Sequence, residues 1–276
     1  MKPTIKALLR DWLPPVLVRA LSTSARSKIR FEGVYATWEE ALHASSGYDN
    51  GSILEKVKDA TLKVKRGDAA YERDSVLFDR IEYSWPVLTG LMWAAALDGG
   101  RVSVLDFGGS LGTSYFQNRP FLNALTDVRW AVVEQHHYVT CGRQYIEDER
   151  VKFFHTIDEC AAEAQPNIAL LSGILQYLRD YETIMKAIVE LAPPLIILDR
   201  TIVNLERQKA IYVQRVPASI YAASYPCYSL PETSIVAIFR GCGYELVSDF
   251  ESLPFGALRA IGSTFKGYIF QRTDRR

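Results

Sequence analysis

The sequence predicts an α/β fold built on a mostly parallel sheet with helices on both faces. After Gly99-Gly100, short apolar runs alternate with stretches of helical periodicity, and the runs lack the polar–apolar alternation of half-exposed strands. Continuous runs of this kind are typical of parallel strands that are buried on both faces. Near the end of the chain two more runs follow each other with no helix between them, which indicates an antiparallel pair at one edge of the sheet.

These runs predict seven strands. In chain order they are Val102–Phe107, Arg129–Glu134, Val151–Phe154, Ile168–Leu171, Leu195–Leu198, Tyr244–Phe250 and Thr264–Gln271. Helices are expected between the first five strands, over 113–125, 137–147, 158–164 and 180–191. Ser229 and Glu232 have capping-box spacing and predict a further helix that stops near Gly241.

The first hundred residues read as helical, so we expect three parts: an N-terminal arm over 1–30, a helical cap over 31–100 and the sheet domain over 101–276. Thr37 and Glu40 have capping-box spacing at the start of a short helix. Two longer helices are expected over 52–66 and 69–97, the second kinked or split by Pro86.

Composition excludes several classes of protein. The chain has 276 residues, 48% hydrophobic and 23% charged, which is the balance of an ordinary globular protein. Its net charge is zero, whereas proteins that grip nucleic acid usually carry a basic excess. The four cysteines form no CxxC pair, and no metal site is expected. No apolar run reaches the roughly 20 residues of a membrane span, and no secretory signal is present, so we expect a cytoplasmic protein.

Charge is concentrated in the N-terminal arm. Residues 1–30 hold seven basic side chains and one acid, Asp11, with apolar residues at helical spacing around Pro14-Pro15. One interpretation is a peripheral helix on an anionic membrane at the inner face of the cell. The other is an arm that docks on its own domain or on a partner.

The sharpest local pattern follows the first predicted strand, where Asp106 leads into Gly108-Gly109-Ser110-Leu111-Gly112. Glycines let the chain turn tightly and let a ligand approach the backbone closely. Neither the G-x-G-x-x-G spacing of nicotinamide and flavin sites nor a phosphate loop with Lys-Ser/Thr fits these residues. The spacing therefore disfavours a nicotinamide oxidoreductase.

The arrangement D-x-G-x-[GS]-x-G does fit, and it resembles the first motif of class I S-adenosylmethionine-dependent methyltransferases. That cofactor has no phosphate and carries an ammonium and a sulfonium, so an acid such as Asp106 can help to hold the ammonium, directly or through water. Glu134 ends the second strand, where a carboxylate can accept both ribose hydroxyls. Gln135 follows where the adenine would lie.

Several longer segments resemble a bacterial family of such methyltransferases that is linked with surface-polysaccharide biosynthesis. The segments are Phe31-Glu-Gly-Val-Tyr, Tyr71-Glu-Arg-Asp-Ser-Val-Leu-Phe, Leu105-Asp-Phe-Gly-Gly-Ser-Leu-Gly, Val133-Glu-Gln, Leu171-Ser-Gly-Ile-Leu-Gln-Tyr-Leu and Ile197-Leu-Asp-Arg-Thr. The resemblance implies a Rossmann-like sheet with strand order 3-2-1-4-5-7-6, only the last strand being antiparallel, and S-adenosyl-L-methionine as the cofactor. It also implies that Asp106, Gly108, Gly109 and Gly112 line the methionine half of the cofactor, that Glu134 binds the ribose, and that Ser172 and Gly173 face the methyl group. Ser110 replaces the middle glycine of the general pattern.

The acceptor should lie at the carboxyl ends of the fourth and fifth strands, where Tyr177 and Arg200 are candidate catalytic residues. Arg200 can anchor a carboxylate or phosphate, or form a structural ion pair; Tyr177 can orient the acceptor or pack in the core. The tyrosine-rich segment 217–231 either covers the site or packs as a loop. We expect methylation of an oxygen on a small or saccharide acceptor. The alternative is a non-catalytic scaffold or regulatory protein of the same fold that binds the cofactor.

Overall fold

The computed structural model describes residues 29–47, 50–206, 208–217, 220, 223–252 and 256–273. Most of the basic arm over 1–30 lies outside the described residues, and so does Tyr221 in the tyrosine-rich segment. The interpretations of that arm as a membrane helix or a docking arm are therefore predictions from sequence.

The central sheet contains the seven predicted strands. They are β4 (Arg101–Phe107), β5 (Asp127–Val133), β6 (Val151–Phe154), β7 (Ile168–Ser172), β8 (Leu195–Asn204), β11 (Tyr244–Glu251) and β12 (Ser263–Arg272). Their spatial order is β6-β5-β4-β7-β8-β12-β11, and β12 runs antiparallel to both of its neighbours. The predicted order of these seven strands is confirmed.

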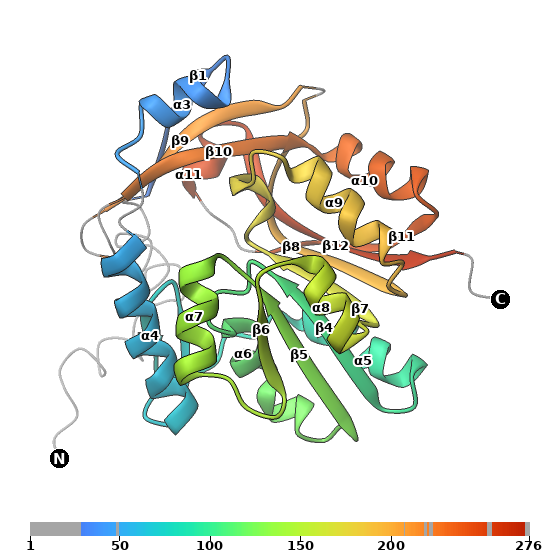
Figure 1. The fold of residues 1–276 in the computed structure, drawn as a ribbon. Coiled ribbons are helices and arrows are strands. Elements are labelled where there is room, and N and C mark those ends of the chain that lie inside the picture. Colours follow the sequence, from blue (N-terminus) through green and yellow to red (C-terminus); the bar gives the residue numbers. More distant parts are fainter. Residues whose placement is uncertain are drawn as a thin grey trace, which may run out of the picture.

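Helices cover both faces of this sheet, as Figure 1 shows. One face packs against α4 (Asn50–Arg66), α5 (Trp85–Leu97), α6 (Thr113–Leu122) and α7 (His136–Tyr145). The other face packs against α8 (Ile157–Ala164), α9 (Tyr181–Glu190) and α10 (Glu232–Gly241). Successive residues of a strand supply the two cores in turn: Val104 belongs to the first cluster and Leu105 to the second.

Three strands that the sequence did not predict extend the sheet to ten. They are β1 (Arg30–Tyr35), β9 (Ala210–Val216) and β10 (Ala223–Pro231). The end of β10 pairs with the end of β8, β9 pairs antiparallel with β10, and β1 pairs antiparallel with β9. The helix α3 (Trp38–His43) packs on this ribbon, which lies above the carboxyl ends of the central strands in Figure 1.

The ribbon corrects two expectations. The segment 217–231 is largely strand β10 and not a loop, because its backbone pairs with β9 from Ala223 to Ser229. The boundary at residue 100 does not separate a cap from the sheet domain, because β1 takes its hydrogen-bonding partner from the C-terminal half of the chain.

The predicted helix over 69–97 is also wrong in its first half. Tyr71–Arg73 and Val76–Phe78 form the hairpin β2–β3, and helix α5 begins only at Trp85. Asp74 and Ser75 both adopt positive φ (52° and 65°), which turns the chain through a two-residue hairpin. Pro86 occupies the first turn of α5, where it starts a helix without breaking one.

One capping prediction is confirmed and one is wrong. The N–H of Glu40 donates to Thr37 Oγ1 (3.2 Å) at the start of α3. Ser229 does not cap α10, because it is buried in β10 and its Oγ accepts a hydrogen bond from Asn204 Nδ2 (2.9 Å). Pro231 occupies the cap position instead.

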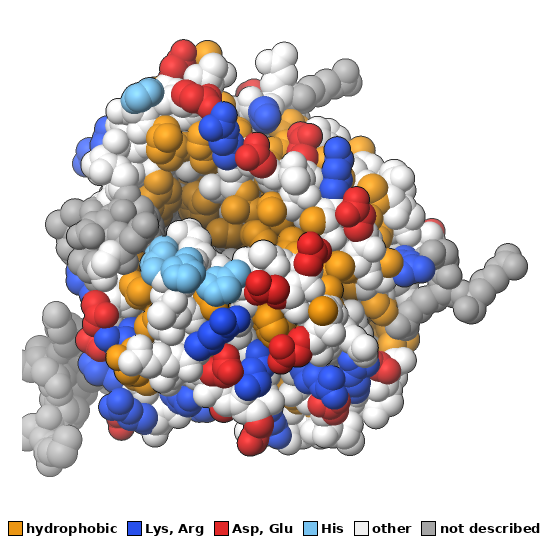
Figure 2. Space-filling view, viewed as in Figure 1, with side chains coloured by type: hydrophobic (Ala, Val, Ile, Leu, Met, Phe, Trp, Pro, Cys, Tyr) orange, Lys and Arg blue, Asp and Glu red, His pale blue; other side chains and the backbone are white. Residues whose placement is uncertain are grey.

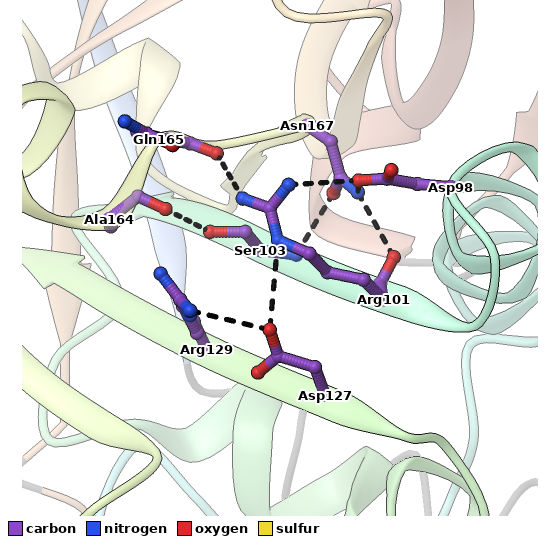
Figure 3. A network of polar contacts seen from close by, with 8 residues as sticks. All are labelled: Asp98, Arg101, Ser103, Asp127, Arg129, Ala164, Gln165 and Asn167. Carbon is purple, nitrogen blue, oxygen red and sulfur yellow. Dashed lines mark hydrogen bonds and ion pairs between the residues drawn. The ribbon is translucent and has the colours of Figure 1, made fainter.

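A polar network joins the amino ends of β4, β5 and β7 (Figure 3). The glycine loop lies at the opposite, carboxyl end of β4. Asn167 Oδ1 accepts from the N–H of Ser103 (2.9 Å), and Asn167 Nδ2 donates to Asp98 Oδ2 (2.9 Å) and to the carbonyl of Arg101 (3.0 Å). Asp98 also pairs with Arg101 (3.0 Å). These bonds fix the register at which the three strands begin.

Three cysteines (Cys141, Cys160, Cys227) are buried free thiols, and Cys242 is exposed. Among the described residues, no helix combines the length and the apolar character that crossing a membrane requires.

Candidate active site

In the loop between β4 and α6, three of five consecutive residues adopt the left-handed backbone conformation. Gly108 (φ 71°), Ser110 (φ 57°) and Gly112 (φ 86°) all have positive φ. The N–H of Gly108 donates to the carbonyl of Val133 (2.9 Å), which ties the loop to the neighbouring strand β5. Ser110 is a rare non-glycine residue in this conformation, and such strain is concentrated at functional sites.

Gly109 closes over the side chain of Asp106. A Cβ placed on Gly109 would lie 2.4 Å from the carboxyl carbon of Asp106, so only glycine fits there. Asp106 is 1% exposed, and its Oδ2 accepts from the indole Nε1 of Trp130 (2.8 Å). Burial raises the pKa of Asp106 to about 7, and the Trp130 bond opposes that rise.

This geometry refines the expected role of Asp106. The carboxylate points beneath the loop and does not open onto its outer surface, so it supports the loop from below. Its Oδ1 has no hydrogen-bond partner among the described residues. One acceptor is therefore left for a water or a ligand group that reaches below Gly109.

Glu134 lies beside the same loop, at the end of β5. Its Oε1 accepts from the N–H of Ser110 (3.2 Å) and its Oε2 from the N–H of Gln135 (2.7 Å). Each oxygen of a carboxylate keeps a second acceptor position. Burial raises the pKa of Glu134 to about 7, and the two N–H bonds oppose that rise. The structure thus brings three of the predicted cofactor-binding residues, Ser110, Glu134 and Gln135, into contact with one another.

A hollow with an apolar floor lies between the β9–β10 ribbon and α7, with histidine side chains along its lower edge (Figure 2). His136, the first residue of α7, stacks on His155, which follows β6 (ring centroids 5.0 Å apart, 16° between planes). His136 follows Glu134 and Gln135 along the chain, where a nucleobase is expected.

The end of β7 and the middle of β8 form a second polar cluster around Asp199. Asp199 Oδ2 accepts from Ser172 Oγ (2.6 Å) and Oδ1 accepts from Ser252 Oγ (3.0 Å). Arg200 donates from Nη2 to Ser172 Oγ (3.1 Å), and its backbone N–H donates to Ser252 Oγ (3.1 Å). Gly173 has φ 72°, and a Cβ there would lie 3.5 Å from the Arg200 guanidinium, so the guanidinium lies over Gly173.

Arg200 is an ion-pair residue in this cluster. Its Nε lies 3.4 Å from Asp199 Oδ2, and its side chain is only 25% exposed. Burial acts to lower the pKa of Arg200, but Asp199 and other acidic neighbours raise it above its usual value. Arg200 also has a positive φ (50°) in an otherwise extended strand. Asp199 neutralises the charge of Arg200. This geometry therefore favours the structural ion pair over an anchor for an anion.

Tyr177, a candidate catalytic residue in the sequence, makes a structural hydrogen bond to strand β9. It ends the short 3-10 helix η1 (Leu175–Tyr177), and its hydroxyl donates to Gln214 Oε1 (2.8 Å) on β9. Gln214 Nε2 donates in turn to the hydroxyl of Tyr225 (3.2 Å) on β10. Burial raises the pKa of Tyr177, which makes its hydroxyl a poor proton donor to a base. Tyr177 therefore ties the end of β7 to the ribbon.

Sequence reasoning assigned no role to Glu72, a buried acid that the structure places against the loop. Glu72 is 2% exposed; it accepts from the hydroxyl of Thr113, the first residue of α6, and from the N–H of Ser75 (3.3 Å). Burial raises its pKa to about 7. The segment Tyr71-Glu-Arg-Asp-Ser is part of the motif that carries the resemblance, but its local pattern gives no sign of the distant partner Thr113.

A cavity of about 260 Å³ opens on the other side of Arg200. The hairpin β2–β3, the start of α5, the second turn of α6, the middle of β8 and the end of β11 line it. Its lining residues are Tyr71, Arg73, Glu82, Tyr83, Ser84, Trp85, Pro86, Gln117, Asp199, Arg200, Phe250, Glu251 and Ser252. No group of three or more His, Cys, Asp or Glu side chains in the described part of the chain is arranged to hold a metal ion.

No protein-family model and no curated protein matches this chain. Several solved structures are similar to it. One is 1,6-didemethyltoxoflavin-N1-methyltransferase from Burkholderia thailandensis, with bound 1,6-didemethyltoxoflavin and S-adenosylhomocysteine (16% identity, 88% of this chain and 93% of that chain, TM-score 0.43). Another is the N-terminal domain of EvdMO1 in the presence of S-adenosylhomocysteine and D-fucose (14%, 82% and 98%, 0.47). A third is magnesium protoporphyrin IX methyltransferase from Synechocystis with bound S-adenosylmethionine (13%, 82% and 99%, 0.43). All three TM-scores are below 0.5, so we argue the function from the residues of this chain.

Proposed function

We propose that this protein is an S-adenosylmethionine-dependent methyltransferase. The observation that carries the proposal is the pair of acids, the buried Asp106 and the partly buried Glu134, that meet at the left-handed loop over 108–112. In open α/β sheets, ligands bind outside the carboxyl ends of the strands, where the strand order reverses. β4 has β5 on one side and β7 on the other, so the loop lies at that reversal.

The donor and acceptor groups fit this cofactor better than a phosphate-bearing one. No basic residue occurs between Asp106 and Thr113, and the ends of β4 and β5 present only carboxylates. The free Oδ1 of Asp106 suits an ammonium, directly or through water, and the remaining acceptor positions of Glu134 suit two ribose hydroxyls. Gln135 and His136 would lie beside the adenine, and Ser172 and Gly173 would lie towards the methyl group.

When bound, the cofactor supplies an electrophilic methyl group on a sulfonium sulfur. The residues of the chain then have to align the acceptor and remove its proton. Asp199 is placed for the second task, because it lines the cavity and its two oxygens are held by Ser172 and Ser252. With the cofactor bound, the Asp199 carboxylate would accept the proton that the acceptor hydroxyl loses on methylation.

We further propose that the acceptor is a small molecule or a saccharide that is methylated on a hydroxyl oxygen. The surface-polysaccharide link of the resembling family supports this acceptor, as does the cavity of about 260 Å³ beside Asp199. We place the protein in the cytoplasm, with peripheral membrane contact through the basic residues of the N-terminal arm.

The test of the cofactor is calorimetric titration of the full chain. S-adenosylhomocysteine should bind and NAD should not. Glu134→Gln removes one carboxylate oxygen from the ribose site and should weaken binding by about 10- to 100-fold, the cost of one or two hydrogen bonds to a charged group. Glu245→Gln changes an exposed acid on β11 and is the matched control, with unchanged affinity. Equal affinity in the Glu134 variant, or binding of NAD alone, would contradict the proposal.

A further inference from the structure

The cavity beyond Arg200 has a wall of aromatic side chains. Tyr83 and Trp85 both line it, with ring centroids 5.1 Å apart. Phe121 supports both rings from α6, at 5.2 Å from Tyr83 and 6.0 Å from Trp85, in edge-to-face contacts. Trp85 is nevertheless 60% exposed. A large aromatic ring that is held in place by its neighbours and left open is a surface prepared for stacking.

The charges of the lining exclude a simple anion site. Arg73 Nη2 pairs with Glu82 Oε2 (2.8 Å), and Arg200 pairs with Asp199 (3.4 Å). Glu251 adds a third acid to these two balanced pairs. A phosphate or carboxylate would therefore meet cations that are already neutralised, together with an excess of negative charge. Groups that both donate and accept hydrogen bonds suit this lining better, and hydroxyls do both.

The size of the cavity also favours a small ligand. Its volume of about 260 Å³ is below the roughly 300–1,000 Å³ of pockets for drug-sized ligands. Gln117 and Tyr71 add polar groups on the walls beside the aromatic rings. One ring with several hydroxyls fits this combination of an apolar platform and balanced polar walls.

We propose that this cavity binds one sugar ring, which stacks on Trp85 and places its hydroxyls against the Arg73–Glu82 pair and Gln117. Asp199 and Arg200, which line the cavity, connect it through Ser172 to the carboxyl end of β7. The inference deepens the proposed function, on which it rests for the statement that this ring belongs to the methyl acceptor. Sugar binding itself is tested independently of the cofactor.

The experiment measures binding of free monosaccharides to the full chain by saturation-transfer difference NMR, with D-glucose, D-galactose, D-fucose and L-rhamnose as probes. At least one sugar should receive magnetisation at its ring C–H protons. Trp85→Ala should reduce its affinity at least about tenfold, while Trp85→Phe, which keeps a stacking surface, should retain most of it. Tyr145→Ala removes another partly exposed aromatic ring, away from the cavity lining, and should bind like the parent.

Calorimetry with S-adenosylhomocysteine on the same variants separates the two proposals. Trp85→Ala should bind it as the parent does. Loss of that binding would show that the cavity belongs to the cofactor and would overturn the inference, as would a preference for inorganic phosphate over every sugar. If S-adenosylhomocysteine binds and no sugar does, the inference fails and the proposed function stands. If a sugar binds in a Trp85-dependent way and S-adenosylhomocysteine does not, the cofactor assignment fails and the sugar site stands. Melting curves of both Trp85 variants establish that they are folded.

Discussion

At the scale of single residues, the burial of Asp106 in the folded protein opposes the ionisation of its carboxyl group. A carboxylate buried at 1% exposure is costly to ionise, and its pKa rises to about 7 in the folded protein, against about 4 in an unfolded chain. Because the folded pKa is the higher one, this group's contribution to stability is complete below pH 4 and is lost as the pH rises to 7. Asn cannot ionise. The unfolding free energy of Asp106→Asn relative to that of the parent should therefore rise by about 2–3 kcal/mol as the pH rises from 5 to 8.

Urea unfolding of the parent and of Asp106→Asn at pH 5, 6, 7 and 8 measures this difference. Glu72 and Glu134 carry similar shifts, but they are present in both proteins and cancel in the comparison. Asp158→Asn changes an exposed acid on α8 in the same way and is the matched control. A stability difference for Asp106→Asn that is constant across the series would mean that Asp106 is already ionised at pH 5.

At the scale of elements, Asn167 stabilises the amino ends of the strands and has no contact with the candidate site. Asn167→Ala leaves the N–H of Ser103 without its partner and removes two bonds, to Asp98 and to Arg101 (Figure 3). An unsatisfied buried donor costs about 1–3 kcal/mol, so the unfolding free energy should fall by about 2 kcal/mol. Affinity for S-adenosylhomocysteine should be unchanged, because the network lies at the amino ends of the strands and the candidate site lies at their carboxyl ends.

Arg129→Ala provides the comparison within the same network. Arg129 is half exposed and contacts Asp127 at 3.4 Å, so its removal should cost at most about 0.5 kcal/mol. Chemical denaturation of both variants tests the ranking. If Asn167→Ala costs no more than Arg129→Ala, the buried amide does not fix the register as argued.

The central strands and helices could be predicted because each one is specified by its own residues. Buried strands such as Ile168–Ser172 are continuous apolar runs, and Asp106 at the end of β4 stands in sequence beside the glycines that it supports. Strand β1 depends on pairing with β9, some 180 residues away in sequence, which no local pattern reveals. For the same reason the contact of Glu72 with Thr113, which is distant from it in sequence, emerged only from the folded arrangement.

On the scale of the whole molecule, charge is divided between the N-terminal arm and the rest of the chain. Residues 1–30 hold seven basic side chains and one acid, while the net charge of the protein is zero, so the remainder is acidic. A basic segment beside an acidic domain is attracted to anionic lipid, at about 1 kcal/mol for each Lys or Arg near the surface. The full chain should therefore bind phosphatidylglycerol vesicles in low salt and leave them as ionic strength rises.

Deletion of residues 1–28 tests this expectation without disturbing the described fold, because it stops before β1 begins at Arg30. Co-sedimentation with phosphatidylglycerol vesicles should fall to the level seen with neutral phosphatidylcholine vesicles, which serve as the control. The melting temperature and the affinity for S-adenosylhomocysteine should match those of the full chain, since all residues of the candidate site are retained. Equal partitioning of the full and shortened chains would show that the arm docks on protein, and the contact with membranes would then have to be abandoned.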